Sequence, residues 1–530
     1  MPTGVRLQKI SLRHLIAMPL FHQLGFSGHP FAKTNADEEP NLGDYFVPPV
    51  YFDAIVGDPN SPSSSVILAP RGAGKTAQRR MVEDKSGELR ILAVTYDRFE
   101  FSGTDRVDEI TLQYHLRNVI TRVLVGILSY ASKYPDVIKN LNKAERKEVG
   151  LFIQTYLGEL TGEEMQELLK ELRSIPETIK KVWLENVAFL EPVVNYLLKA
   201  YDLESIDLPD IKQEEKRLSA TYKYQLESLL TYGKKIGFKS IYVLIDKVDE
   251  TEHTGNNAQN TYSLIRPLIR DLELLGLEGY AFKFFLWDKI EEFYRRDARP
   301  DRVPQYKLKW SRQELREVLS ARLKAFSDGR ISSIQQLLTS PPGFDVDDAI
   351  CVMANGSPRN MIRICERILT AQSARDTNSQ TIDLQSVDSG ILEFSEMLIL
   401  ELYGDEILRD MQRVGRELFT TNFVANDVLK ISGQGARNKI TGWANTGAVK
   451  QVGTIVVPPA RRPVNLYCAV DPVVVRIMHR TTPFKEFFEQ RWHSCTECQT
   501  ENLFDAQYYK GENPPVCRAC GRAFPEWAAS

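Results

Sequence analysis

Apolar runs of strand length alternate with helical stretches over the first 310 residues of the chain. Four of these runs are bounded by polar or glycine-rich turns, which is typical of buried strands. They lie at 65–69, 90–97, 240–245 and 281–287. The first run leads into a glycine-rich turn and then into a helix. These elements predict an α/β core with a parallel sheet.

Helical periodicity dominates the segment 107–235, which separates the two halves of this core. Apolar residues from Leu112 to Leu128 recur every three or four positions, and a capping box at Thr161 to Glu164 predicts the start of another helix. We interpret 107–235 as an all-helical insertion, so that the core comprises 41–106 and 236–310. Helices are expected at 112–128, 165–172, 179–200 and 214–235.

Two further segments follow the core. A capping box at Ser311 to Glu314 opens a helical segment, 311–398, which we interpret as a lid. The segment 399–485 has the order helix, turn, helix and hairpin, which predicts a winged helix. Its helices are expected at 424–431 and 436–444, and its strands at 448–452, 454–457 and 464–470.

Composition and charge narrow the class of protein. The 530 residues allow about three or four domains, and 67 Lys and Arg against 70 Asp and Glu give a net charge of −3. This charge excludes attraction of the whole chain to a polyanion, so any contact with nucleic acid must be local. No apolar run approaches the roughly 18 residues of a membrane-spanning helix, and we expect a cytoplasmic protein with no membrane partner. Residues 1–40 form a basic arm, with a transit peptide as the alternative.

The sequence Ser65-Val-Ile-Leu-Ala-Pro-Arg-Gly-Ala-Gly-Lys-Thr76 is a strand, a glycine-rich loop and a helix start, the context of a phosphate-binding loop. The glycines let backbone N–H groups curl around a polyphosphate, Lys75 reaches its β and γ oxygens, and the Thr76 hydroxyl ligates Mg²⁺. Ala69 departs from the strict pattern, which has glycine at that position. The residues expected to hold the nucleotide are Arg71, Gly72, Ala73, Gly74, Lys75, Thr76 and Ala77.

A second motif follows the strand Ser240 to Ile245, which ends in Asp246 and is followed by Asp249 and Glu250. Asp246 is placed to hold Mg²⁺, and Asp249 or Glu250 comes within reach of the γ-phosphate to polarise an attacking water. Each motif alone also has a bland interpretation, as a glycine-rich turn or as a buried strand with a polar exit. Their order in one chain instead indicates Walker A and Walker B elements.

The spacing Asp246-x-x-Asp249-Glu250 resembles that of the additional-strand, catalytic-glutamate P-loop ATPases, especially STAND ATPases, their KAP relatives and the origin-recognition branch of AAA+. NACHT-type members usually have a small residue after the first Asp, whereas this chain has Lys247, which leaves open whether Asp249 or Glu250 is the base. The sequence 356–359, Gly-Ser-Pro-Arg, resembles the lid motif of these families. This resemblance implies that Pro358 lies by the adenine and that Arg359 senses the γ-phosphate, with a helix start on the surface as the alternative.

Three less specific signals surround these motifs. Asp288 follows the strand 281–287, where the resembling families carry a polar sensor. Arginines at 295, 296, 299 and 302 form either a solvated face or the source of an arginine finger. Tyr51, Phe52 and Asp53 are candidates for the adenine pocket by the same resemblance, and packing of a loop over the sheet is the alternative.

The predicted winged helix carries a local positive charge. Residues 411–480 contain ten Lys and Arg against three Asp and Glu. The residues expected on or beside the recognition helix and on the wing are Arg437, Lys439, Trp443, Arg461 and Arg462. Such a surface can contact DNA phosphates. In STAND-like proteins the same module often packs against the ATPase, so DNA and a protein surface both stay open as partners.

Two cysteine pairs near the C-terminus, Cys495 with Cys498 and Cys517 with Cys520, each have two intervening residues and lie eighteen residues apart. This is the spacing of a structural zinc site with four thiolates, so we predict a zinc ribbon over 490–530. Four thiolates leave no open position on the ion for catalysis. The aromatic residues that could stack on bases or on a partner protein are Phe504, Tyr508, Tyr509, Phe524 and Trp527.

Together these motifs predict an ATPase of the STAND and origin-recognition type with ATP, Mg²⁺ and Zn²⁺ as its ligands. Nucleotide state would control conformation and self-association, so a homo-oligomer is expected. No effector motif is visible, so a role in a pathway such as bacterial defence, which rests on the resemblance alone, would need a protein effector partner. The alternatives are a DNA-binding loader or remodeller and a scaffold that binds ATP without hydrolysis.

Overall fold

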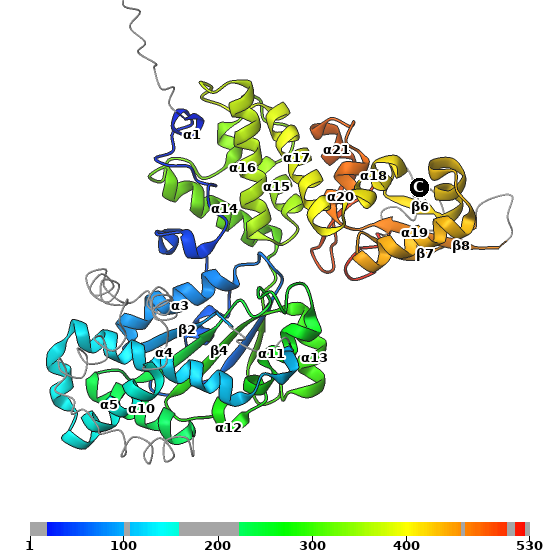
Figure 1. Cartoon of the computed structure of the whole chain (residues 1–530). Helices are drawn as coiled ribbons and strands as arrows, with labels where there is room; N and C mark the ends of the chain where they lie inside the picture. The colour runs from blue at the N-terminus through cyan, green and yellow to red at the C-terminus, as the bar shows by residue number, and fades with distance from the viewer. Residues whose placement is uncertain (1–18, 100–105, 158–221, 457–461, 506–514, 525–530) are drawn as a thin grey trace, which may run out of the picture. The chain divides into compact units, whose positions relative to one another are not determined.

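The computed structural model describes residues 19–99, 106–157, 222–456, 462–505 and 515–524. The chain divides into two compact units. The sheet unit comprises Asn35–Gly43 and Pro48–Lys309. The C-terminal unit comprises Met1–Thr34, Asp44–Val47 and Trp310–Ser530. Figure 1 labels many of the elements of both units.

A five-stranded parallel sheet in the order β2-β3-β4-β1-β5 forms the centre of the sheet unit (Figure 1). Its strands are β1 Ser65–Ala69, β2 Ile91–Tyr96, β3 Ser240–Ile245, β4 Tyr280–Trp287 and β5 Gln305–Lys307. The α/β fold with a parallel sheet is therefore confirmed. β4 lies between β1 and β3, the strands of the two phosphate motifs. β5, only three residues long, was not predicted.

Helices pack around this sheet, and those from α4 onwards share one hydrophobic core with it. They are α2 Phe52–Val56, α3 Lys75–Leu89, α4 Leu112–Lys133, α5 Lys143–Leu157, α10 Tyr222–Ile236, α11 Ala258–Ile269, α12 Leu272–Leu275 and α13 Glu291–Asp297. Single 3₁₀ turns lie at Ala36–Glu38, Leu42–Asp44, Val107–Glu109, Pro135–Asn140 and Asp288–Ile290.

The sequence assigned α4 and α10 to an insertion, but both pack against the sheet within its own core. Gly126 lets α4 approach β2, because a Cβ atom there would lie 3.0 Å from Leu92 Cδ1. The expected helices at 165–172 and 179–200, and the capping box before them, lie outside the described residues.

The first part of the C-terminal unit is helical. Its helices are α1 Leu20–Gln23, α14 Arg312–Phe326, α15 Val346–Ala354, α16 Pro358–Arg375, α17 Leu384–Leu402 and α18 Asp405–Val414, with a 3₁₀ turn at Ile334–Leu337. The predicted capping box is present: Ser311 accepts the N–H of Glu314, whose carboxylate accepts the N–H of Ser311. The helical lid is therefore confirmed as a set of packed helices.

The rest of the C-terminal unit contains two small antiparallel sheets. The first has the order β6-β8-β7, with β6 Leu418–Thr420, β7 Val449–Ile455 and β8 Val464–Ala469. Between β6 and β7 the chain forms a π-helix, Phe423–Leu429, and then α19, Gly433–Thr446. After β8 it forms α20, Pro472–Met478, and α21, Phe484–Arg491. The second sheet pairs β9 Trp492–Ser494 with β10 Glu501–Leu503.

The element order of the winged helix agrees with the sequence, but two details differ. The strands expected at 448–452 and 454–457 form one strand, β7, with an irregular register between Gln451 and Gly453. β6, which completes the sheet, was not expected. Within the described residues, no helix combines the length and the apolar character needed to cross a membrane.

Candidate nucleotide site and metal centre

The loop between β1 and α3 has the backbone of a phosphate cradle. Gly72 and Gly74 adopt φ angles of 77° and 99°, the left-handed region that favours glycine. Within the described part of the chain, no side chain caps the start of α3, so the N–H groups of its first turn are available to an anion. Ala69 still belongs to the extended strand β1, where the glycine of the strict pattern is not required. The loop therefore fits a polyphosphate.

The two motifs meet at Thr76 and Asp246. The Thr76 hydroxyl donates to Asp246 Oδ2 at 2.9 Å. Burial raises the pKa of Asp246, and the charges of Arg79 and Lys75 and the hydrogen bond from Thr76 oppose this shift. A hydroxyl beside a carboxylate is an oxygen ligand set that Mg²⁺ prefers. The pair therefore fits a magnesium ion.

Lys75 lies inside the loop rather than at its surface. Its ammonium group donates to the carbonyl oxygens of Ala69 and Pro70, each at 3.3 Å. Burial lowers the pKa of Lys75, while Asp249, Asp246 and two further carboxylates oppose the shift. The sequence-predicted residues of both motifs thus form one electrostatic environment around this amine.

Arg79, one turn after Thr76, was not singled out from the sequence. Its side chain is 2% exposed, and its Nε lies 3.2 Å from Asp246 Oδ2 and its Nη1 2.6 Å from Glu83 Oε1. Burial alone would lower the pKa of Arg79, but Glu83, Asp246 and Asp37 outweigh it and the net shift is upward. The i, i+4 spacing to Glu83 was a visible signal. The contact with Asp37, far upstream, was not.

The two acidic residues after β3, Asp249 and Glu250, differ in their exposure to solvent. Asp249 is buried, whereas Glu250 is exposed. Arg71 donates from Nε to Asp249 Oδ2 and from Nη2 to the Asp249 carbonyl oxygen, both at 2.7 Å. The Arg71 guanidinium also lies over the Trp287 ring, 4.5 Å from its centroid. Arg71 therefore links the phosphate loop to the ends of β3 and β4.

Lys247, which departs from the pattern of the resembling families, adopts a left-handed backbone with φ 56°. Its ammonium group pairs with Asp37 at 2.7 Å and with Asp97 at 3.0 Å. Burial alone would lower the pKa of Lys247, but these two carboxylates outweigh it and raise the pKa. Lys247 is thus occupied by ion pairs with two other segments.

The structure places Asp288, the arginines after β4 and the adenine-pocket candidates in different kinds of surroundings. Asp288 follows β4, and its Oδ1 is buried without a hydrogen-bond partner among the described residues, which fits a polar group that meets a ligand. Arg295 and Arg299 pair with Glu291 and Asp301, at 2.6 and 2.8 Å. Of the adenine-pocket candidates, Phe52 is a core residue and Tyr51 stacks on Tyr306 at 5.1 Å. Asp53 is exposed.

Pro358 and Arg359 open α16 in the C-terminal unit. Pro358 is the first helical residue, and the Ser357 hydroxyl caps the helix by accepting the N–H of Asn360 at 3.2 Å. Arg359 is exposed, and no hydrogen bond or ion pair joins it to any residue in the described ranges. Their roles at a nucleotide stay predictions.

The four cysteines of the predicted ribbon converge on one point. Their Sγ atoms all lie within 4.8 Å of one another, with Cys495 to Cys520 at 3.7 Å and Cys498 to Cys517 at 3.5 Å. A tetrahedral zinc ion with Zn–S bonds of about 2.3 Å separates its sulfurs by about 3.8 Å, so the cluster fits Zn²⁺.

The backbone of the ribbon repeats the same turn at both cysteine pairs. Gln499, after Cys498, and Gly521, after Cys520, both adopt positive φ angles, 56° and 73°. Phe504 and Phe524 are buried with the cysteines, so neither is free to stack on bases, contrary to the sequence interpretation. Tyr508, Tyr509 and Trp527 lie outside the described residues.

The surface of the winged helix also differs from expectation. Trp443 is 2% exposed and packs edge-on against Phe419, so it is a core residue and not a contact residue. Lys439 pairs with Glu406 and Asp410, at 2.6 and 2.7 Å. Arg437 is exposed, as is Arg462 on the wing, and Arg461 lies outside the described residues.

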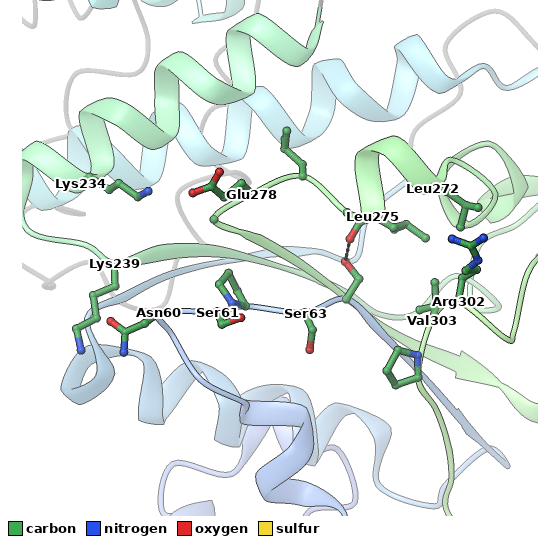
Figure 2. A pocket seen from close by; sticks show the side chains of 16 residues that line it. Asn60, Ser61, Ser63, Lys234, Lys239, Leu272, Leu275, Glu278, Arg302 and Val303 are labelled. Atoms are coloured by element: carbon green, nitrogen blue, oxygen red, sulfur yellow. Dashed lines mark hydrogen bonds between the residues drawn. The ribbon is translucent and has the colours of Figure 1, made fainter.

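A pocket of about 550 Å³ opens in the sheet unit away from these motifs. It is lined by residues that precede the strands, such as Ser64, Lys239, Gly279 and Pro304. In a parallel sheet these starts lie at the edge opposite the phosphate loop, which follows β1. Figure 2 shows Lys239 and Asn60 at one end of this pocket and Arg302 at the other. The pocket is therefore separate from the candidate nucleotide site.

Comparison with known proteins finds only weak similarity. No protein-family model and no curated protein matches the sequence. Among solved structures, the Aeropyrum pernix ORC1 protein in complex with DNA is 12% identical, with a TM-score of 0.34 over 86% of this chain and 97% of that chain. The Aeropyrum pernix ORC2 protein, solved as ADPNP-ADP complexes, is 10% identical, with a TM-score of 0.35 over 83% and 95%.

The Drosophila ORC bound to DNA is 13% identical, with a TM-score of 0.29 over 91% of this chain and 96% of that chain. Scores this low carry no argument about function, so the proposals for this chain rest on its own residues.

Proposed function

We propose that this chain binds ATP with Mg²⁺ and hydrolyses it. The observation that carries this proposal is the 2.9 Å hydrogen bond between Thr76 and Asp246, which joins the two phosphate motifs across the sheet. A buried lysine lies beside this pair, and the first turn of α3 offers uncapped N–H groups to an anion. A fortuitous glycine-rich turn would not bring these groups to one place.

The proposed roles follow from the chemistry of each group. The first-turn N–H groups of α3 and the Lys75 ammonium bind the phosphates, so Lys75 exchanges its loop carbonyls for phosphate oxygens. Thr76 and Asp246 would hold Mg²⁺, which neutralises charge on the phosphates when bound. Glu250 or Asp249 orients the attacking water and takes its proton.

The test compares Lys75→Ala with Lys85→Ala, an exposed lysine on the same helix. We expect Lys75→Ala to lower ATP turnover by about 100-fold or more, because it removes a cation aimed at the phosphates, while Lys85→Ala stays within about two-fold of wild type. Phosphate release and binding of a fluorescent ATP analogue provide the measurements. Wild-type binding and turnover in Lys75→Ala would overturn the proposal.

We further propose that nucleotide state controls conformation and self-association. Light scattering with ADP and with a non-hydrolysable ATP analogue tests this, and an identical molar mass in both would argue against it. An effector partner and a role in bacterial defence have no support beyond the resemblance. A scaffold that binds ATP without turnover remains the alternative, and it predicts that Glu250→Gln leaves a near-zero rate unchanged.

DNA binding is the second candidate, because one observation favours it. From Val428 to Val470 the winged helix has six Lys and Arg and no Asp or Glu. Lys439 is paired internally, so we choose two of the exposed cations of this segment for the test, Arg437 and Arg462. If DNA binds here, Arg437→Glu with Arg462→Glu weakens binding at 50 mM salt for every sequence and lowers its salt dependence. An absence of DNA affinity in the wild-type protein at that salt concentration would remove this candidate.

A further inference from the structure

The zinc ribbon makes a specific contact with the lid through Arg518, which lies directly after Cys517. Its guanidinium donates to three carbonyl oxygens from three segments. They are Glu501 O at 2.8 Å in β10, Val470 O at 2.7 Å after β8, and Asn355 Oδ1 at 3.0 Å in the lid. The planar fork of arginine suits such a fixed arrangement.

The lid end of this contact is the turn before α16. Asn355 ends α15 in a left-handed conformation with φ 50°, and Gly356 continues it with φ 76°. Ser357 then caps α16, whose first residues are Pro358 and Arg359. Arg518 therefore holds the turn that sets the start of the helix carrying the predicted γ-phosphate sensor.

A second link joins the ribbon to the start of the lid. Glu501 in β10 accepts from Arg312 Nε at 2.8 Å and from Trp492 Nε1 at 2.6 Å. Arg312 also pairs with Asp348 in α15. The same ribbon strand thus contacts α14 and, through Arg312, α15. The ribbon is built into the lid and is not a module attached only by its chain ends.

The metal site controls the position of Arg518. The Arg518 N–H donates to Asn502 Oδ1 in β10 at 2.9 Å, and the Cys517 carbonyl accepts the N–H of Gly521 at 2.9 Å. The turn at each cysteine pair is called a knuckle here, and Arg518 is fixed by the second knuckle and by β10. Four neighbouring thiolates stay together only when a cation neutralises them. Loss of the cation would release the knuckle and, with it, the three contacts of Arg518.

We propose that the ribbon is a zinc-dependent clamp on the lid, with Arg518 as the residue that positions the 355–359 turn. The clamp itself follows from contacts within the C-terminal unit. Its consequence for the nucleotide, that loss of zinc lowers the preference for ATP over ADP, rests on the proposed function and on the sensor role predicted for Arg359.

Hydrogen exchange of the full-length protein tests the clamp without nucleotide. We expect amides of 352–361 to exchange about ten-fold faster in Arg518→Ala and after zinc chelation, because the contacts that restrain the turn are lost. Arg522→Ala is the matched control: it changes an exposed arginine of the same knuckle, which pairs with Glu497, and leaves the lid contact intact. Unchanged exchange in Arg518→Ala, with zinc retained, would overturn the clamp.

Asn355→Gly isolates the lid contact from any damage to the ribbon. Glycine tolerates φ 50°, so the turn can persist while the bond to Arg518 is removed. We expect one zinc per chain as in wild type, faster exchange at 352–361, and a three- to ten-fold lower preference for ATP over ADP with ADP affinity unchanged.

The outcomes separate the two proposals. If wild type binds no ATP, the proposed function fails and the exchange data alone decide the clamp. If wild type binds ATP but Asn355→Gly alters neither exchange nor the ATP to ADP preference, the clamp fails alone. Faster exchange with an unchanged preference would keep the clamp and reject its link to nucleotide sensing.

Discussion

The Nε atom of Arg71 lies 2.7 Å from the Oδ2 atom of Asp249, so the first acid after Walker B is already paired with the phosphate loop. Glu250, in contrast, is exposed beside it. Asp249 would have to give up its contact with Arg71 before it could turn towards a water molecule. We therefore propose Glu250, rather than Asp249, as the base.

This relationship predicts an asymmetry between two variants. We expect Glu250→Gln to slow ATP turnover by about 10²- to 10⁴-fold and to leave ATP binding within about two-fold, because only the proton acceptor is lost. Asp249→Asn should cost less than about ten-fold, since its oxygen can still accept from Arg71. Phosphate release and equilibrium ATP binding measure both. The reverse order of effects would assign the base to Asp249.

His115 predicts a pH dependence of the sheet unit. The buried imidazole of His115 lies 2.9 Å from the Tyr96 hydroxyl and 2.8 Å from the Leu264 carbonyl oxygen. Burial lowers the pKa of His115 to about 4, against 6.5 for the free side chain. Between pH 6.5 and pH 4 the unfolded chain binds a proton at His115 that the folded chain does not bind. The contribution of His115 to the free energy of unfolding is therefore fully present above pH 6.5 and is lost as the pH falls towards 4.

The expected loss from His115 is about 2 kcal/mol in the free energy of unfolding between pH 7 and pH 5. Urea unfolding of wild type and of His115→Gln at both pH values isolates the contribution of His115 to this pH dependence. Glutamine can keep both hydrogen bonds but does not titrate. An equal pH dependence in the two proteins would show that His115 does not carry it.

The sequence predicted those parts of the site that are local in the chain. The phosphate loop, the acidic end of β3 and the cysteine pairs are short motifs whose chemistry follows from spacing. Contacts such as Arg79 with Asp37, or Arg518 with Asn355, join segments that only the fold brings together. Trp443 was misplaced because the pattern of a short helix does not show which face packs against β6.

Trp443 and Arg437 lie on the same helix, α19, but their replacement by alanine should affect the stability of the C-terminal unit very differently. Trp443→Ala should destabilise the C-terminal unit by about 3–5 kcal/mol, because it empties a large buried site. Arg437→Ala should change stability by less than about 0.5 kcal/mol. Chemical unfolding followed by circular dichroism measures both. Similar effects of the two variants would mean that Trp443 is not in the core.

Zinc removal gives a prediction for the ribbon itself. Cys498→Ser should lower zinc content below one per chain and lower the melting temperature of the C-terminal unit by roughly 5–10 °C, because the ion holds both knuckles together. Cys468→Ser is the control, since this cysteine lies in β8 outside the cluster and should leave zinc bound. Metal analysis and thermal scans measure both. Full zinc occupancy in Cys498→Ser would contradict the four-thiolate site.

The strand order has a consequence for the synthesis of the chain. Among the described strands, β1 pairs with β4 and β5 alone, and these leave the ribosome more than two hundred residues later. Until about residue 287 is made, the apolar strand that leads into the phosphate loop has neither partner, and its unpaired edges are exposed to association with other chains. A ribosome-bound fragment that ends before β4 should therefore lack a folded sheet and attract chaperones, whereas one that extends well past β5 should not.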